Sequence, residues 1–385
     1  MRRAPVAWFA VGFTMMSKFR LHLRRPQYRL RTLLLLFVVL SLPLAVWTHR
    51  EHQHRIQVAA YRVLRREGAR CYVLTDCYNC GAGYDSEIAD YNHCRELLRG
   101  DVLRRDDVVV GVDVWGLPVS DDDVLSAIMC FPSLKALDFR QTSTSERRFG
   151  EIAKLRSLEA LHLNDTGITD LTLRHLSALR SMRLLNLRHT KISSAAPAYL
   201  SSMRQLEILV LAAHNIGDES LRHLAGLPRL RVLSLSETRV TDKGLATLRP
   251  LKSLQFLDLD ECLISDAGLA ELADFHTLTG LVLSRTRVSD KGLATLRRLK
   301  SLDFLDLEDC AISDAGVAQL CEMTSLRTVG LTGTSVTSAG VARLRSMNPK
   351  IDGDWPEGTV PEDHDEGGVE ARRRAEEDLP YRARN

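Results

Sequence analysis

The stretch LRVLSLSETRVTDKGLATL at residues 230–248 decides the fold. Leu233 and Leu235 point to one side of a short strand while Ser234 points to the other, which is the pattern of a strand with one buried face. Thr241 and Asp242 then provide a helix N-cap and an acid favoured by the helix dipole. Leu245 and Leu248 follow at helical spacing. This stretch therefore predicts a strand, a turn and a helix that share one buried side.

The same unit recurs along the chain every 24 residues. Its opening residues are Leu134, Leu158, Met182, Leu206, Leu230, Leu254, Leu278, Leu302 and Leu326, and a degenerate unit with Val109, Val112, Val114 and Val119 precedes them. One unit cannot bury its own leucines, because burial offsets the ordering cost only when neighbouring units share a core. About ten stacked units are expected.

Two further positions of the unit are occupied by small residues. Threonine or cysteine stands in the turn that leaves the strand, as at Thr238, Cys262 and Cys310, where a hydroxyl or thiol can bond to the backbone. Glycine recurs in the first helical turn, as at Gly244 and Gly268, and is interpreted as a point of close approach between coils.

These units resemble the leucine-rich-repeat family, specifically its cysteine-containing class, whose units end in C/T-x-x-(I/L)-T/S-D-x-(G/A)-L. The resemblance covers roughly residues 109–349. It implies an α/β fold, namely a right-handed solenoid or horseshoe with a parallel concave sheet and convex helices. The motif is specific for the fold and much less specific for a function. Some members of the class are substrate receptors of ubiquitin ligases, but no F-box-like segment is visible in this sequence.

A charge-free apolar run of 17 residues, 32–48, precedes the repeats and predicts one N-terminal transmembrane helix. Eight basic residues and no acid lie within 1–31, so this segment is expected in the cytoplasm and the repeats on the other side of a membrane. The alternative is a cleaved signal peptide, although no small-x-small site follows the run. This layout resembles membrane-anchored bacterial leucine-rich-repeat proteins.

The remaining segments complete the predicted domain organisation. Residues 49–108 are expected to form a juxtamembrane helix and an N-terminal cap, 109–351 the solenoid, and 352–385 a disordered charged tail. Four cysteines lie within the cap: Cys71, Cys77, Cys80 and Cys94. Disulfides are favoured because the predicted export permits them, while free thiols and a zinc site remain alternatives.

The composition and motifs exclude several classes of function. The apolar fraction of 45% and charged fraction of 26% are those of a folded domain. The net charge is +3, and the basic residues are concentrated ahead of the repeats, so nucleic acid is not an expected partner. No phosphate-binding loop, nucleophile elbow, dinucleotide fingerprint or zinc-protease motif is present. The sequence predicts no enzyme, no cofactor and no metal.

The expected concave face carries the candidate site. Its apolar members are Leu184, Ile208, Val232, Phe256 and Phe304, and its charged members are Asp258, Asp260, Glu261, Arg285, Asp306, Glu308 and Asp309. Apolar stripes with charged rims mark interaction surfaces. The second acidic set, Asp306, Glu308 and Asp309, can be explained as an inherited copy of the first. Residues 239–259 and 287–307 match at 18 of 21 positions and so look like a duplication. A solvated face with strand-favouring residues is the alternative interpretation.

Two functions fit these patterns. The first is a membrane-anchored, non-catalytic scaffold whose concave face binds a protein partner through a basic or amphipathic segment. The second is a structural or envelope-organising spacer without a specific ligand. A metal-dependent enzyme built on the cysteine cap is a remote third.

Overall fold

The computed structural model describes residues 26–74, 94–96, 109–117, 122–143, 146 and 149–356. The chain divides into two compact units, Met1–Ile56 and Gln57–Asn385, and the second holds the described strands. The strands are β1 (Arg70–Leu74), β2 (Cys94–Glu96), β3 (Val109–Asp113), β4 (Ala136–Asp138), β5 (Ala160–His162), β6 (Leu184–Asn186), β7 (Ile208–Val210), β8 (Val232–Ser234), β9 (Phe256–Asp258), β10 (Gly280–Val282), β11 (Phe304–Asp306), β12 (Thr328–Gly330) and β13 (Asp352–Asp354). The helices are α2 (Pro26–Arg66), α3 (Asp122–Ile128), α4 (Phe149–Ile152), α5 (Asp170–Leu176), α6 (Ala196–Leu200), α7 (Asp218–Leu221), α8 (Asp242–Thr247), α9 (Asp266–Leu272), α10 (Asp290–Leu296), α11 (Asp314–Leu320) and α12 (Ser338–Met347).

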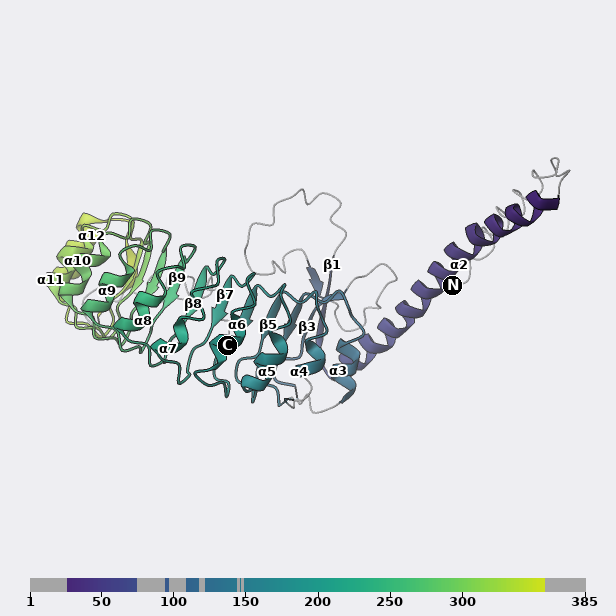
Figure 1. Cartoon of the computed structure of the whole chain (residues 1–385). Coiled ribbons are helices and arrows are strands. Elements are labelled where there is room, and N and C mark those ends of the chain that lie inside the picture. Colours follow the sequence, from purple (N-terminus) through teal and green to yellow (C-terminus); the bar gives the residue numbers. More distant parts are fainter. Residues whose placement is uncertain are drawn as a thin grey trace. The chain divides into compact units, whose positions relative to one another are not determined.

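The strands form one sheet in chain order from β3 to β13, and these eleven strands are parallel. Each coil pairs with the next at a shift of 24 residues, as in Leu209↔Leu233 and Leu233↔Leu257. Helices alternate with these strands along the stack, as Figure 1 shows. The predicted solenoid of strand–helix coils with a parallel sheet is confirmed.

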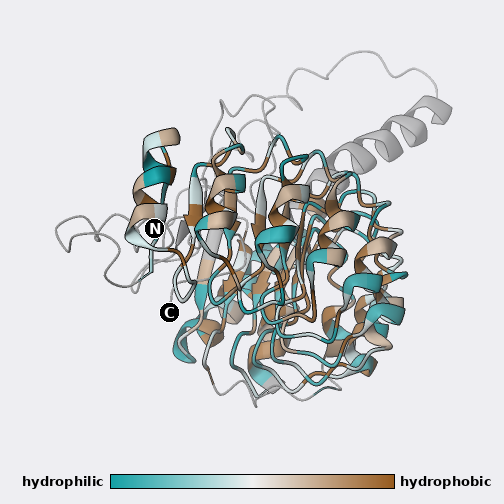
Figure 2. Cartoon of the chain, turned by 90° about the vertical axis from the view of Figure 1, so that its left-hand side faces the viewer, coloured by the Kyte–Doolittle hydropathy of each residue, from teal (hydrophilic) through white to brown (hydrophobic). Residues whose placement is uncertain are grey.

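The hydrophobic core lies between the sheet and the helices. Leu233 and Leu235 from the strand segment and Leu245 and Leu248 from the helix segment of one coil are fully buried in a single cluster. In Figure 2 the strands and inner turns are mostly brown, whereas teal residues lie on the outer turns. The other side of the sheet carries no helix of the coils, and we call it the open face.

The first and last coils are covered by other elements of the same unit. Ala60, Tyr61 and Leu64, at the end of α2, are buried against the core. β1 pairs antiparallel with both β3 and β2, so the parallel order stops there. At the far end β13 and the buried Trp355 extend the sheet into the segment predicted as a disordered tail.

The predicted membrane anchor is contradicted. Of the helices in the described ranges, none combines the length and the apolar composition needed to cross a membrane. The apolar run at 32–48 is part of a helix of 41 residues that continues through Arg50, Glu51 and His52 to Arg66. Alone, the run would span about 25 Å at ~1.5 Å per residue, less than a hydrocarbon core of about 30 Å. The same finding contradicts the predicted single-pass location, with the N-terminus cytoplasmic and the repeats outside.

A carboxylate joins successive coils on the helix side. The Ser or Thr that caps one helix also binds the acid of the preceding coil: Ser313 donates its backbone N–H to Asp290 Oδ1 at 2.9 Å and its hydroxyl to Oδ2 at 2.6 Å. We call this arrangement the carboxylate clamp. The same pair of hydrogen bonds joins Asp170 to Ser193, Asp218 to Thr241, Asp242 to Ser265, Asp266 to Ser289 and Asp314 to Thr337. Thr169 also donates its N–H and its hydroxyl to Glu146, but both bonds go to the single oxygen Oε1.

The clamp explains two features of the sequence. The hydrogen bonds from Thr337 lower the pKa of the Asp314 carboxyl, so the acid accepts them in its charged form. The recurring glycine makes room for the carboxylate, because a Cβ at Gly268 would overlap Asp242 and one at Gly316 would overlap Asp290. The interpretation of these glycines as points of close approach is confirmed, and the group they approach is an acid of the preceding coil.

Replacing a clamp acid is expected to destabilise the solenoid. Asp290→Ala removes both acceptors of Ser313 and should cost about 1–3 kcal/mol of unfolding free energy. Asp274→Ala is the matched control, since Asp274 is exposed and makes only a 3.8 Å ion pair with Arg298; it should change stability by less than about 0.5 kcal/mol. Urea unfolding followed by circular dichroism measures both. Equal midpoints for the two variants would contradict the role given to the clamp.

Candidate functional site: the open face of the sheet

The open face is built from alternate strand positions. Residues two, four and six places after each opening residue point away from the core, because side chains alternate across a strand. Those at the second place are Ala136, Ala160, Leu184, Ile208, Val232, Phe256, Gly280, Phe304 and Thr328. The parallel register aligns them in one row across the sheet.

The predicted apolar stripe forms a second hydrophobic cluster, separate from the core. Leu184, Ile208 and Val232 are exposed by only 2%, 5% and 8%. They pack together with Val210, and the partly buried Phe256 packs against the cluster. These three residues lie on the open face, as the alternation predicts, but offer little surface to a partner.

The two predicted phenylalanines are half-buried and stack. Phe256 of β9 and Phe304 of β11 have ring centroids 6.1 Å apart and planes at 30°. Gly280 of β10 lies between them in the register, and a Cβ there would overlap the Phe256 ring. Because Gly280 has no side chain, the Phe256 ring can lie over it and stack on Phe304.

The predicted acidic patch divides into a buried row and an exposed edge. Asp258, Asp260 and Asp306 are buried. Ser234 donates a hydrogen bond to Asp258 at 2.7 Å. The edge comprises the exposed Glu261, Arg285 and Asp309 and the half-buried Glu308.

Arg285 is the base within this patch. Its guanidinium donates to Asp260 at 2.7 and 3.1 Å and lies 3.0 Å from Glu261. The bonds to Asp260 raise the pKa of Arg285, so its charge is fixed. Arg285 neutralises part of the patch, and Glu308 and Asp309 extend the acidic edge on the next coil.

A second cluster on this face was not predicted. On β4–β6 and the turns after them, Arg140 binds Asp138 at 2.7 Å and lies 4.7 Å above the ring of Trp115. His162, Asn164 and Arg188 lie on the next two coils. The polar residues at places four and six were a sequence signal for this cluster, because those places point to the open face.

The four cap cysteines are only partly described. Cys71 is buried in β1, Cys94 belongs to β2, and Cys77 and Cys80 lie outside the described residues. The proposed disulfides stay a prediction. In the part of the chain that the structure describes, no group of three or more His, Cys, Asp or Glu residues is placed to hold a metal ion.

The cysteines of the repeat turns have structural contacts. Cys262 donates to the Leu235 carbonyl at 3.1 Å, and Thr238 binds the same oxygen at 2.6 Å. Cys310 repeats the contact on Leu283 at 3.0 Å. Burial raises the pKa of Cys262 to about 11, so its thiol stays protonated and unreactive.

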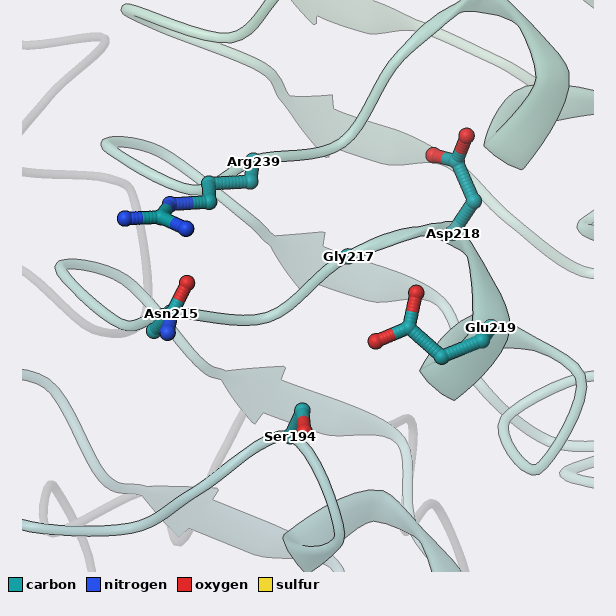
Figure 3. A pocket seen from close by; sticks show the side chains of 6 residues that line it. All are labelled: Ser194, Asn215, Gly217, Asp218, Glu219 and Arg239. Carbon is teal, nitrogen blue, oxygen red and sulfur yellow. The ribbon is translucent and has the colours of Figure 1, made fainter.

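Among the described coils from Glu146 onward, the clamp is interrupted once, and a pocket lies there. Ser194 stands where other coils carry the acid, and Gly217 stands where they carry the capping Ser or Thr. Ser194, Asn215, Gly217, Asp218, Glu219 and Arg239 line a polar pocket of about 400 Å³. Figure 3 shows Arg239 and Glu219 on either side of Gly217, with Asp218 turned away from Ser194 toward the next coil.

Restoring the clamp at this place should stabilise the protein. The triple variant Ser194→Asp/Gly217→Ser/Ser220→Gly gives this interface the acid, the hydroxyl and the glycine found at the clamps from Asp218 onward, and should add about 1–2 kcal/mol of unfolding free energy. Ser194→Asp alone is the control, because it supplies the acid without the hydroxyl and keeps the Ser220 side chain in its way. An unfolding midpoint of the triple variant at or below that of the wild type would show that the missing clamp is not a weak point.

The phenylalanine stack should depend on Gly280. Gly280→Ala forces the Phe256 ring to move and should cost about 1–3 kcal/mol by overpacking. Gly226→Ala is the control, since a Cβ there meets nothing within 4 Å, and its stability should be unchanged or slightly raised. Thermal unfolding compares the two, and an unaltered melting temperature for Gly280→Ala would refute the close contact.

Comparison with known proteins identifies the repeat. A family model described as leucine-rich repeat matches residues 298–321. No curated protein matches the chain.

Three solved structures are among those similar to this chain. An internalin (inlF) from Listeria monocytogenes is 19% identical, with 67% of this chain and 91% of that chain covered and a TM-score of 0.41. An internalin C2 (inlC2) from Listeria monocytogenes is 22% identical, with 60% and 81% covered and a TM-score of 0.41. A TDR receptor is 17% identical, with 65% and 45% covered and a TM-score of 0.46. Similarities of this size carry no argument about what this chain binds.

The matched coil lies within the run of coils that share its leucine spacing and, from Asp218 onward, an unbroken clamp. Such stacks present an extended face to other proteins and are generally interaction scaffolds rather than enzymes. The family match, together with the leucine spacing that the other coils share with it, supports a leucine-rich-repeat family for this chain.

Proposed function

We propose that the chain is a non-catalytic scaffold that binds a basic segment of a partner protein on the open face at β9–β11. The observation that carries the proposal is the half-buried Phe256–Phe304 stack beside the acidic edge. Aromatic side chains that are partly exposed next to charged groups are typical anchors of protein interfaces.

Charge supports a basic rather than an acidic partner. Places two to seven of these three coils carry six acids, Asp258, Asp260, Glu261, Asp306, Glu308 and Asp309, against the single base Arg285. Arg285 is already paired with Asp260 and Glu261, so an acidic ligand would have to compete with these two carboxylates for it. A lysine or arginine of the partner would meet complementary potential at the exposed edge.

The stack supplies the apolar part of the contact. Because Leu184, Ile208 and Val232 are buried, Phe256 and Phe304 are the predicted apolar residues with surface left to offer. A lysine or arginine of the partner can lay its aliphatic stem on the Phe256 and Phe304 rings and place its charge at Glu261 or Asp309, so one side chain contacts both the stack and the acidic edge.

Partner capture by the full-length chain tests this function. We expect Phe256→Ala/Phe304→Ala to reduce recovery of a specific partner at least tenfold, since anchor residues contribute about 2 kcal/mol or more. Leu171→Ala/Leu263→Ala is the matched control, because these leucines are 48% and 44% exposed and lie outside the strands. Crosslinking in the native host and mass spectrometry identify the partner.

Two outcomes would count against the scaffold. Equal recovery of every partner by both double variants would remove the proposed surface. Partners insensitive to any open-face substitution would favour the structural spacer instead. Unfolding midpoints of all variants establish that a loss of capture is not a loss of folding.

A further inference from the structure

Three coils away from the acidic edge, the open face carries a polar cluster whose charges are already paired. Asp138 accepts from Arg140 Nε at 2.8 and 3.0 Å. Arg188 Nη2 donates to Glu237 at 3.0 Å, two coils further along. Burial lowers the pKa of His162, which lies beside Asp138 in the register, so its ring is neutral near pH 7.

Three polar atoms of this polar cluster lack a hydrogen-bond partner. Among the described residues, His162 Nδ1, Asn164 Oδ1 and Arg188 Nε are buried and form no hydrogen bond. Folded proteins pair nearly all such groups, and each unpaired one costs about 1–3 kcal/mol. All three belong to two neighbouring coils, the ones that contain β5 and β6. A local concentration of unpaired groups indicates a site that is completed by something else.

The atoms define what the missing group must offer. Arg188 Nε is a donor, Asn164 Oδ1 is an acceptor, and the neutral His162 ring can serve either way at Nδ1. A charged ligand would find its opposite charges already occupied by Asp138 and Glu237. A peptide unit carries one donor and one acceptor and no net charge, so it matches the cluster.

We propose that Asn164 and Arg188 form a subsite for the main chain of an extended peptide segment, with Asn164 Oδ1 accepting a peptide N–H and Arg188 Nε donating to a peptide carbonyl. This inference rests on the proposed function and adds a second contact to the same partner. His162, two residues before Asn164 on β5, bounds the subsite.

The sheet fixes the distance between the subsite and the phenylalanine stack. β6 and β9 are separated by three strand steps of ~4.8 Å, or about 15 Å. An extended chain covers this in four to five residues at ~3.3 Å each. The partner segment should therefore carry a basic residue about five positions from the peptide units bound at Asn164 and Arg188.

Backbone substitution in a bound peptide tests the subsite directly. Random 12-residue peptides displayed on phage are selected on the full-length chain, and one selected peptide is synthesised with single amide-to-ester replacements. At one or two positions the ester should weaken binding to the wild type about three- to tenfold, the value of one hydrogen bond. Fluorescence anisotropy gives the affinities.

The variants separate this inference from the proposed function. With Asn164→Ala, the ester that weakens binding to the wild type should cause no further loss of affinity. With Phe256→Ala/Phe304→Ala, which removes the other contact, the same ester should weaken binding as much as it does with the wild type. Arg188→Lys keeps a positive charge for Glu237 but removes the Nε–H donor. It should therefore weaken binding of the all-amide peptide. Glu237→Gln is its control, because it leaves Nε in place.

The results that overturn each claim differ. Equal ester penalties on wild type and Asn164→Ala overturn the subsite alone, provided that binding still depends on Phe256 and Phe304. Binding that is indifferent to those phenylalanines overturns the proposed function. Failure to select any peptide overturns both.

Discussion

A carboxylate that reaches from one coil to the helix cap of the next is the contact on which the order of this structure depends. The leucine core holds coils together without direction, since hydrophobic burial is non-directional. The clamp adds direction, because Asp266 must meet both the N–H and the hydroxyl of Ser289. It also excludes a side chain at Gly292, so three positions in two coils are fixed by one interaction.

The open face inherits its geometry from this stacking. Parallel pairing at a constant shift places Phe256, Gly280 and Phe304 in one row, and only the absence of a Cβ at Gly280 lets the Phe256 ring lie there. The same register places Asn164 and Arg188 on adjacent coils. Neither arrangement is a property of a single coil. The stack as a whole sets the spacing that a bound segment must match.

Much of the fold was predictable because each coil repeats the same physical requirements. The 24-residue leucine spacing located the strands, and the Ser/Thr-Asp pair located the helix starts at Thr241, Ser265 and Ser289. The acid was assigned to the helix dipole, whereas its partner is the cap residue 23 positions later, a relation that exists only once the coils stack.

Other features depend on packing that no single coil encodes. Glu237, Glu261 and Arg285 adopt left-handed backbone conformations with φ of 57°, 55° and 54°. The sequence does not indicate this, because the left-handed region favours glycine and none of the three is glycine. Alternation placed Asp258 and Asp260 on the open face, but their burial comes from neighbouring coils. The apolar run at 32–48 resembled an isolated span, while in the structure it is one part of a longer helix that continues into charged residues.

Amide hydrogen exchange in the native state tests the central claim, that carboxylates bind the capping residues of successive coils. The N–H groups of Ser265, Ser289 and Ser313 should exchange slowly, because Asp242, Asp266 and Asp290 accept them. The N–H of Gly217, which faces Ser194 instead of an acid, should exchange much faster. Equally fast exchange at all four positions would contradict the account.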